Sequence, residues 1–184
     1  MLFWLPIASN LLIYALRVVE LKTPRAFTAG EVRENLTLRL IVAVSGLIFL
    51  SSMAEYLFVR PGLNWVLFGL GWACVITSFA VRRRAIAALG RFWSLQVEIR
   101  SEHEFVRNGP FRFMRHPAYF SMVLELVALA LICNARFTLL LVPLLFLPVL
   151  LKRLRIEEMA LTDKFGDAYR EYQRSTPALF PRVW

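Results

Sequence analysis

The sequence predicts an all-α fold that crosses a membrane about five times and ends in a cytoplasmic C-terminal helix. Two observations lead to this prediction. Hydrophobic residues make up 58% of the 184 residues, a larger share than soluble domains usually contain. They also gather in runs whose lengths approach the roughly 20 apolar residues that a helix needs to cross the hydrocarbon of a bilayer.

Five apolar segments account for the predicted spans. The first has no basic start and no small-residue cleavage site, so we expect it to remain in the protein as a span. The last two are short, and the turn Asn134–Arg136 between them predicts a tight helical hairpin. Pro143 and Pro148 are expected to kink the last span. The five segments are Leu2–Val19, Leu38–Phe58, Leu63–Val81, Ala118–Cys133 and Phe137–Leu151.

The basic residues predict how the chain is oriented. Of the 22 lysines and arginines, only Arg60 and Arg136 fall in the second and fourth connections. The others belong to the first connection, the third connection and the tail. Connections rich in basic residues stay in the cytoplasm. We therefore expect a multi-pass membrane protein with its N-terminus outside, and with the third connection, the active site and the C-terminus in the cytoplasm.

The tail is predicted to be helical from Lys152 to about Gln173, with a break near Gly166. Pro177 and Pro181 then stop helix formation. We expect a single domain over residues 1–184, in which residues 1–81 form the N-terminal spans and residues 82–184 carry the chemistry.

Charge and cysteine content exclude other classes of protein. The net charge of +9 would suit a nucleic-acid partner, but the charges lie between apolar runs and form no long basic stretch. No nucleic-acid partner is therefore expected. Cys74 and Cys133 lie in or beside apolar runs without metal-ligand spacing, so neither a metal site nor a disulfide is expected.

The stretch "VRNGPFRFMRHPAYF" is the most polar part of the third connection, and both histidines, His103 and His116, fall in this connection. Pro117 suits the first position of a helix, so His116 is expected to cap the fourth span. The free N–H groups of a helix N-terminus attract anions, and Arg115 would add donors, so a carboxylate or phosphate is the expected guest. The turn signal Asn108–Pro110 is expected to fold His103 back toward His116.

The tail supplies a second polar pair. Arg153 and Glu157 are four residues apart, and therefore share one face of the predicted helix. Arg153 follows the fifth span at interface depth, where it can meet a lipid-borne group, and Glu157 lies one turn further into the cytoplasm. Glu158 points about 100° away and is the less favoured participant. An ordinary surface ion pair is the alternative interpretation.

Glu125 lies two turns into the fourth predicted span, where an ionisable group is costly. Two interpretations stay open. Glu125 is either a neutral carboxyl bonded to a neighbouring helix, or a functional group that takes a proton from a phenol or hydroxyl acceptor.

Taken together, these residues resemble the isoprenylcysteine carboxyl methyltransferase family of membrane enzymes. The resemblance runs from about Leu89 to Pro181 and rests on "LGRFWSLQV", "HEFVRNGPFRFMRHPAY", "RLRIEE" and "FGDAYREY" in this order. It implies a methyltransferase that uses S-adenosylmethionine (SAM) and methylates a carboxylate or hydroxyl of a prenylated or lipid-like acceptor at the membrane–cytosol interface. The implied partners are this lipophilic acceptor and membrane lipid, and no metal is implied.

The resemblance also implies the roles of individual residues. Arg153 matches the arginine that handles the acceptor, and Glu125 is our additional catalytic candidate. Glu157 is expected to pair with the ammonium group of SAM. The residues implied to line the cofactor site are Gln96, His103, Glu104, Phe105, Val106, Phe111, His116, Pro117, Ala118, Tyr119 and Glu157.

This chain departs from the family pattern at two positions, because Phe111 stands where a tyrosine is usual and Ser121 where a glycine is usual. Three alternatives stay open. An Arg-His-Pro-x-Tyr pattern also occurs in NADPH-dependent membrane reductases that resemble the steroid 5α-reductases. A phospholipid N-methyltransferase would use the same chemistry but would have little use for Arg153. A non-enzymatic scaffold would leave the clustering of Gln96, His103 and His116 unexplained.

Overall fold

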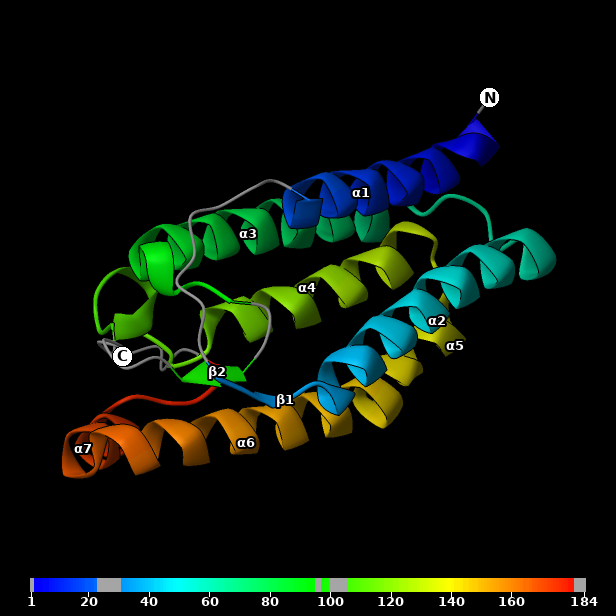
Figure 1. Ribbon diagram of the computed structural model, residues 1–184. Coiled ribbons are helices and arrows are strands. Elements are labelled where there is room, and N and C mark those ends of the chain that lie inside the picture. The colour runs from blue at the N-terminus through cyan, green and yellow to red at the C-terminus, as the bar shows by residue number, and fades with distance from the viewer. Residues whose placement is uncertain (1, 23–30, 95–96, 100–105, 181–184) are drawn as a thin grey trace.

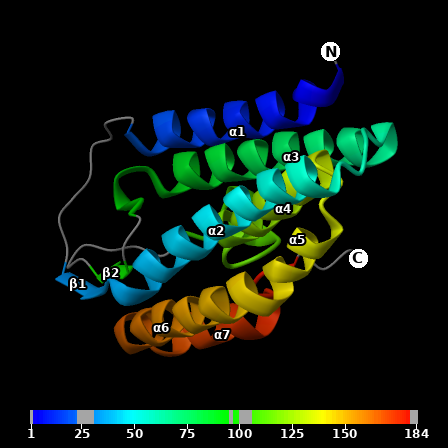
Figure 2. The same ribbon diagram turned by 90° about the vertical axis from the view of Figure 1, so that its right-hand side faces the viewer.

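The protein is a bundle of long helices that run alternately in opposite directions, which confirms the predicted all-α membrane architecture (Figures 1 and 2). The computed structural model describes residues 2–22, 31–94, 97–99 and 106–180. The helices are α1 (Leu5–Lys22), α2 (Leu36–Val59), α3 (Trp65–Leu89), α4 (Pro117–Ile132), α5 (Arg136–Leu141), α6 (Leu147–Phe165) and α7 (Asp167–Ser175). Short 3₁₀ turns cover Leu2–Trp4, Gly90–Phe92 and Gly109–Arg112.

Within the described residues, four helical stretches are long and apolar enough to cross a membrane: Leu2–Glu20, Leu36–Val59, Trp65–Phe92 and Arg136–Phe165. The remaining predicted span is α4, whose 16 residues extend only about 24 Å at 1.5 Å per residue. This is less than the roughly 30 Å of bilayer hydrocarbon. Helix α4 lies between α3 on one side and α2 and α6 on the other (Figure 1), and most of its residues are buried or half-buried.

The last predicted span continues directly into the tail helix. Helix α5 is followed by a π-helical segment, Val142–Phe146, and then by α6. Pro143 lies inside this segment and has no N–H to give to the α-helical ladder, which accounts for the local change of hydrogen bonding. The predicted effect of the prolines therefore takes the form of a π-helical turn.

The predicted break in the tail lies at Gly166. Helix α6 ends at Phe165, and Gly166 adopts φ 56° and ψ −130° before α7 begins at Asp167. A positive φ costs a glycine little. Helix α7 then folds back beside α6 at one end of the bundle (Figure 1).

Helices α3 and α4 form the most extensive helix pair of the bundle. Gly71 on α3 is the point of closest approach, since a Cβ atom at this position would lie 2.6 Å from the Ile132 side chain and 3.1 Å from the Ala128 carbonyl oxygen. The absence of a side chain at Gly71 thus allows α4 to pack directly on the backbone of α3.

Two short strands, β1 (Glu31–Glu34) and β2 (Val97–Ile99), form an antiparallel ribbon that the sequence interpretation missed. Glu31 pairs with Ile99, and the register shifts between Val32 and Glu34. The ribbon joins the first and third connections at the end of the bundle where α4 begins and α6 ends (Figure 1). The described parts of the segments predicted to be cytoplasmic therefore meet at one end of the molecule.

Candidate functional site at the start of helix α4

The backbone at the start of α4 is held by the tail. His116 is the N-cap residue and Pro117 is the first residue of the helix, as the sequence predicts. The N–H of Arg115 donates to the carbonyl of Pro177, and the N–H of His116 donates to the carbonyl of Ala178, both at 2.9 Å. The segment after α7 therefore fixes the approach to α4.

The Arg153–Glu157 pair of α6 meets the first turn of α4 through Tyr119. The phenol of Tyr119 accepts a hydrogen bond from Arg153 Nε at 3.0 Å and donates one to the carboxylate of Glu157. Arg153 is 3% exposed, whereas the side chain of Glu157 is 31% exposed. The guanidinium is thus enclosed in the bundle, while the carboxylate keeps access to its surroundings.

Two further contacts complete this arrangement. Arg153 Nη1 donates to Thr37 Oγ1 of α2 at 3.2 Å, and Thr37 is itself buried. The ring of His116 stacks on that of Tyr119, with centroids 5.5 Å apart and planes 13° apart. His116 Nδ1 lies 3.8 Å from a carboxylate oxygen of Glu157.

Glu158, which the helix geometry disfavoured, is a central residue of the site. It accepts a hydrogen bond from Arg115 Nε at 2.6 Å and lies 3.1 Å from His116 Nε2. The imidazole ring of His116 presents one nitrogen to each of the two neighbouring glutamates. Glu158 is therefore held by partners within the chain, and the preference for Glu157 as the group that binds a ligand stays a prediction. The side chains of Arg115 and His116, which were expected to attract an anion, thus both contact a carboxylate of the chain itself.

Arg115 also binds the tail. Its Nη1 donates to the carbonyl of Gln173 at 2.8 Å and to the carbonyl of Thr176, and Gln173 in turn donates from Nε2 to Glu158 at 3.4 Å. Since these acceptors occupy the guanidinium, Arg115 connects the residues before α4 to α6 and α7 and does not present an open anion site.

The turn before α4 is anchored by α7. Asn108–Pro110 forms the predicted turn, with Gly109 at φ 59° and the 3₁₀ turn running to Arg112. Phe111 is buried, and its carbonyl accepts a hydrogen bond from the Tyr172 hydroxyl at 2.6 Å. Burial raises the pKa of Tyr172 to about 12, against the opposing influence of the Arg115 and Arg107 guanidiniums. Tyr172 therefore keeps the proton that it donates at neutral pH.

The predicted cofactor residues fall into two groups. Gln96, His103, Glu104 and Phe105 lie outside the described residues. The described ones all lie at this end of the bundle, since Phe111, His116, Pro117 and Tyr119 are buried around the start of α4, and Val106 and Ala118 are half-buried. Among the described residues, no three His, Cys, Asp or Glu side chains gather in a way that suits a metal ion.

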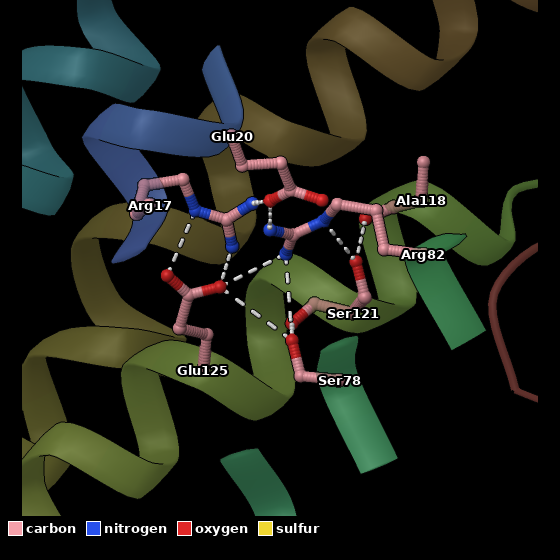
Figure 3. A network of polar contacts seen from close by, with 7 residues as sticks. All are labelled: Arg17, Glu20, Ser78, Arg82, Ala118, Ser121 and Glu125. Atoms are coloured by element: carbon pink, nitrogen blue, oxygen red, sulfur yellow. Dashed lines mark hydrogen bonds and ion pairs between the residues drawn. The ribbon is translucent and has the colours of Figure 1, made fainter. Parts of the chain in front are cut away.

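Glu125 lies apart from this site. Its two carboxylate oxygens contact the guanidiniums of Arg17 on α1 and Arg82 on α3 (Figure 3). These contacts agree with the interpretation in which Glu125 is bonded to neighbouring helices, and both of its arginine partners lie on such helices. A catalytic role for Glu125 remains a prediction, and these ion pairs give it no support.

Comparisons with known proteins show the family to which the chain belongs. The sequence profile of the Isoprenylcysteine carboxyl methyltransferase (ICMT) family matches residues 70–163, about half of the chain. The uncharacterized protein YpbQ of Bacillus subtilis is 33% identical over 126 residues, which cover 67% of this chain and 73% of YpbQ. Protein-S-isoprenylcysteine O-methyltransferase A of Arabidopsis thaliana is 30% identical over 162 residues, 84% of this chain and 82% of the relative.

A solved structure shares the fold. The eukaryotic intramembrane Ras methyltransferase ICMT superposes with a TM-score of 0.71 over 100% of this chain and 68% of its own, at 20% sequence identity. The region that the family profile matches includes α4 and nearly all of α6, which carry the polar site described above. The protein is therefore a polytopic membrane protein that belongs to the isoprenylcysteine carboxyl methyltransferase family.

Proposed function

We propose that this protein is a SAM-dependent methyltransferase that acts on a lipophilic acceptor at the membrane–cytosol interface. The observation that carries the proposal is the chain of contacts Arg153–Tyr119–Glu157, which joins an enclosed guanidinium to a partly exposed carboxylate at the end of the bundle. Membership of the family and the names of the methyltransferases among its relatives support it.

The residues at this end suit the chemical groups of SAM. The partly exposed carboxylate of Glu157 can pair with the ammonium group of SAM. Phe111, His116 and Tyr119 are buried beside it and are predicted to line the cofactor site. SAM supplies an electrophilic methyl group on its sulfonium. The chain contributes position, because methyl transfer depends on aligning the acceptor atom with that methyl group.

Arg153 is the residue proposed to hold the acceptor. Its burial keeps water away from the guanidinium, and Thr37 and Tyr119 fix its direction. A fixed, poorly solvated guanidinium binds a carboxylate more strongly than a solvated one does. The ion pairs of Glu125 favour an acceptor that needs no base, so a carboxylate is the first acceptor to test and a hydroxyl the second.

The decisive experiment is a calorimetric titration of the detergent-solubilised protein with SAM and with NADPH. We expect SAM to bind and NADPH not to bind. Glu157→Gln and Glu157→Ala should each weaken SAM binding about tenfold or more, since a charge-assisted hydrogen bond contributes roughly 1.5–3 kcal/mol.

The exposed Glu171 on α7 provides the matched control. Glu171→Gln removes one carboxylate from the same end of the molecule and should leave the affinity for SAM unchanged. Binding of NADPH in place of SAM would favour the reductase alternative, and wild-type affinity in the Glu157 variants would remove Glu157 from the site.

A further inference from the structure

A second polar cluster lies inside the bundle, where α1, α3 and α4 meet (Figure 3). It is on the other side of α4 from Tyr119, because Ser121 follows Tyr119 by two residues, or about 200° of helical rotation. Arg82 is 2% exposed, Ser78 and Ser121 are 0% exposed, and Glu125 is 8% exposed. The cluster consists of Arg17 and Glu20 on α1, Ser78 and Arg82 on α3, and Ser121 and Glu125 on α4.

The charges of the cluster alternate and balance. Arg17 Nε and Arg82 Nη2 each lie 2.9 Å from a carboxylate oxygen of Glu125. Glu20 in turn accepts from Arg17 Nη1 at 2.8 Å and from Arg82 Nη1 at 3.2 Å. Buried charges persist when they are paired and fully hydrogen-bonded, so each arginine holds both acids and the three helices are tied together.

The cluster also reaches the backbone of the first turns of α4. Arg82 Nε donates to Ser121 Oγ at 2.9 Å, and Ser121 Oγ donates to the carbonyl of Ala118 at 2.6 Å. Ser78 Oγ donates to the carbonyl of Ser121 at 2.8 Å. Two residues of α3 therefore hold the same helical turn that carries Tyr119.

Helix α4 is thus held from two sides at one level. On the first side, Arg82 and Ser78 bind Ser121, and on the second, Arg153 and Glu157 bind the phenol of Tyr119. A hydrogen-bonded helix rotates as a unit. A rotation of α4 that broke the hydrogen bonds to Ser121 would therefore also move the Tyr119 hydroxyl away from α6.

We propose that Arg82 and Ser121 are positioning residues, which set the rotation of α4 so that the Tyr119 phenol meets both Arg153 and Glu157. The consequence for turnover rests on the proposed function, whereas the position of Tyr119 does not. The two are tested by separate measurements.

The first measurement is ¹⁹F NMR of protein labelled with 3-fluorotyrosine in detergent. The chain has five tyrosines, and the Tyr119 resonance is the one that Tyr119→Phe removes. In Ser121→Ala this resonance should shift or broaden, because α4 no longer has a single rotation, while the other four stay in place.

Ser52 on α2 offers a matched control. It is equally buried, and its hydroxyl likewise donates to the carbonyl three residues earlier and accepts from a side chain of another helix, here Asn10. Ser52→Ala should leave the Tyr119 resonance unchanged. If Ser121→Ala does not fold, Ser78→Ala gives the same measurement, since it removes the bond to the Ser121 carbonyl. A Tyr119 resonance at the wild-type position in the folded variant overturns the proposal.

The second measurement is a double-mutant cycle on methyl transfer, in a wild type first shown to bind SAM. In the wild-type background, Ser121→Ala should lower kcat about three- to tenfold. In the Tyr119→Phe background, the same substitution should leave kcat unchanged. Equal losses in both backgrounds would mean that Ser121 stabilises the bundle without acting through Tyr119, and would overturn the proposal. A wild type that binds no SAM would instead refute the proposed function, and the ¹⁹F result would still decide the position of Tyr119.

Discussion

Arg153 combines a permanent charge with nearly complete burial, and the hydroxyls of Tyr119 and Thr37 fix the direction of its guanidinium. An arginine held in this way presents a planar set of donors with little water around it. Both properties favour the binding of a carboxylate, because the hydrogen bonds are charge-assisted and the electrostatic attraction is stronger where water is excluded. The setting of Arg153 therefore suits the recognition of an anionic acceptor.

Substitution of Arg153 should separate binding from chemistry. Arg153→Ala is expected to keep its affinity for SAM and to lose most methyl transfer, because the acceptor oxygen is no longer aimed at the methyl group. Arg153→Lys should recover only part of the rate, since an ammonium keeps the charge but lacks the planar two-pronged grip on a carboxylate. The rate would be measured with acceptors found by screening prenylated thiols, lipid phenols and quinol-like compounds.

Arg155 serves as the control for Arg153. It lies two residues further along α6 and is exposed, so Arg155→Ala should turn over at the wild-type rate. The alternative of an ordinary surface ion pair, whose loss would cost at most about 1 kcal/mol of stability and leave turnover unchanged, does not fit Arg153, which is 3% exposed. A wild-type rate in Arg153→Ala would therefore show that the acceptor is held elsewhere.

Ser121 connects the buried polar cluster to the backbone of α4. It was singled out as a departure from the family pattern, and its hydroxyl joins Arg82 to the backbone of α4. The other departure, Phe111, is buried and contributes its carbonyl to the bond with Tyr172.

At the scale of the helices, the close contact of α3 with α4 is expected to contribute to the stability of the bundle. Residues of α4 leave no room for a Cβ atom at Gly71. Its substitution is therefore predicted to push α3 and α4 apart. Gly71→Ala should lower stability by about 1–3 kcal/mol, the usual cost of adding atoms to a packed core. The measurement is the apparent thermal midpoint of the detergent-solubilised protein, followed by tryptophan fluorescence.

Gly69 lies on the same helix, and a Cβ atom added there would meet no neighbouring atom within 4 Å. Gly69→Ala should therefore raise stability by about 0.5–1 kcal/mol, because alanine is the better helix former. If Gly71→Ala gave the same gain as Gly69→Ala, the close approach of α3 and α4 would not be a constraint on the fold.

At the scale of the whole molecule, the site should face the cytoplasm. The ribbon β1–β2, the turn before α4 and α7 gather at one end of the bundle (Figure 1), and the positive-inside rule predicts that this end lies in the cytoplasm. In a background without Cys74 and Cys133, a cysteine at exposed Arg136 should react with an impermeant thiol reagent added to intact cells. A cysteine at exposed Ser175 should react only after the cells are permeabilised.

Arg136 is preferred to its neighbour Asn134 as the labelling position, because Asn134 is 8% exposed. Reaction at Ser175 and not at Arg136 in intact cells would reverse the proposed topology, and would place the site on the outer face.

The sequence by itself determined the features that depend on neighbours along the chain. The apolar runs define the spans, His116-Pro117 marks the start of α4, and Gly166 marks the break between α6 and α7. It also placed Arg153 and Glu157 on one face, because residues four apart on a helix always share a face. These features follow from hydrophobic patterning, the fixed φ of proline and the freedom of glycine.

Only the tertiary structure decided which partners these residues meet. Glu158 accepts a hydrogen bond from Arg115, 43 residues earlier in the chain, because the fold brings α6 beside the residues that precede α4. Thr37 reached Arg153 across 116 residues, and Arg17 reached Glu125 across 108. No local sequence pattern predicts such pairs, because they depend on how each helix is rotated against its neighbours. That rotation is set by the packing of the whole bundle.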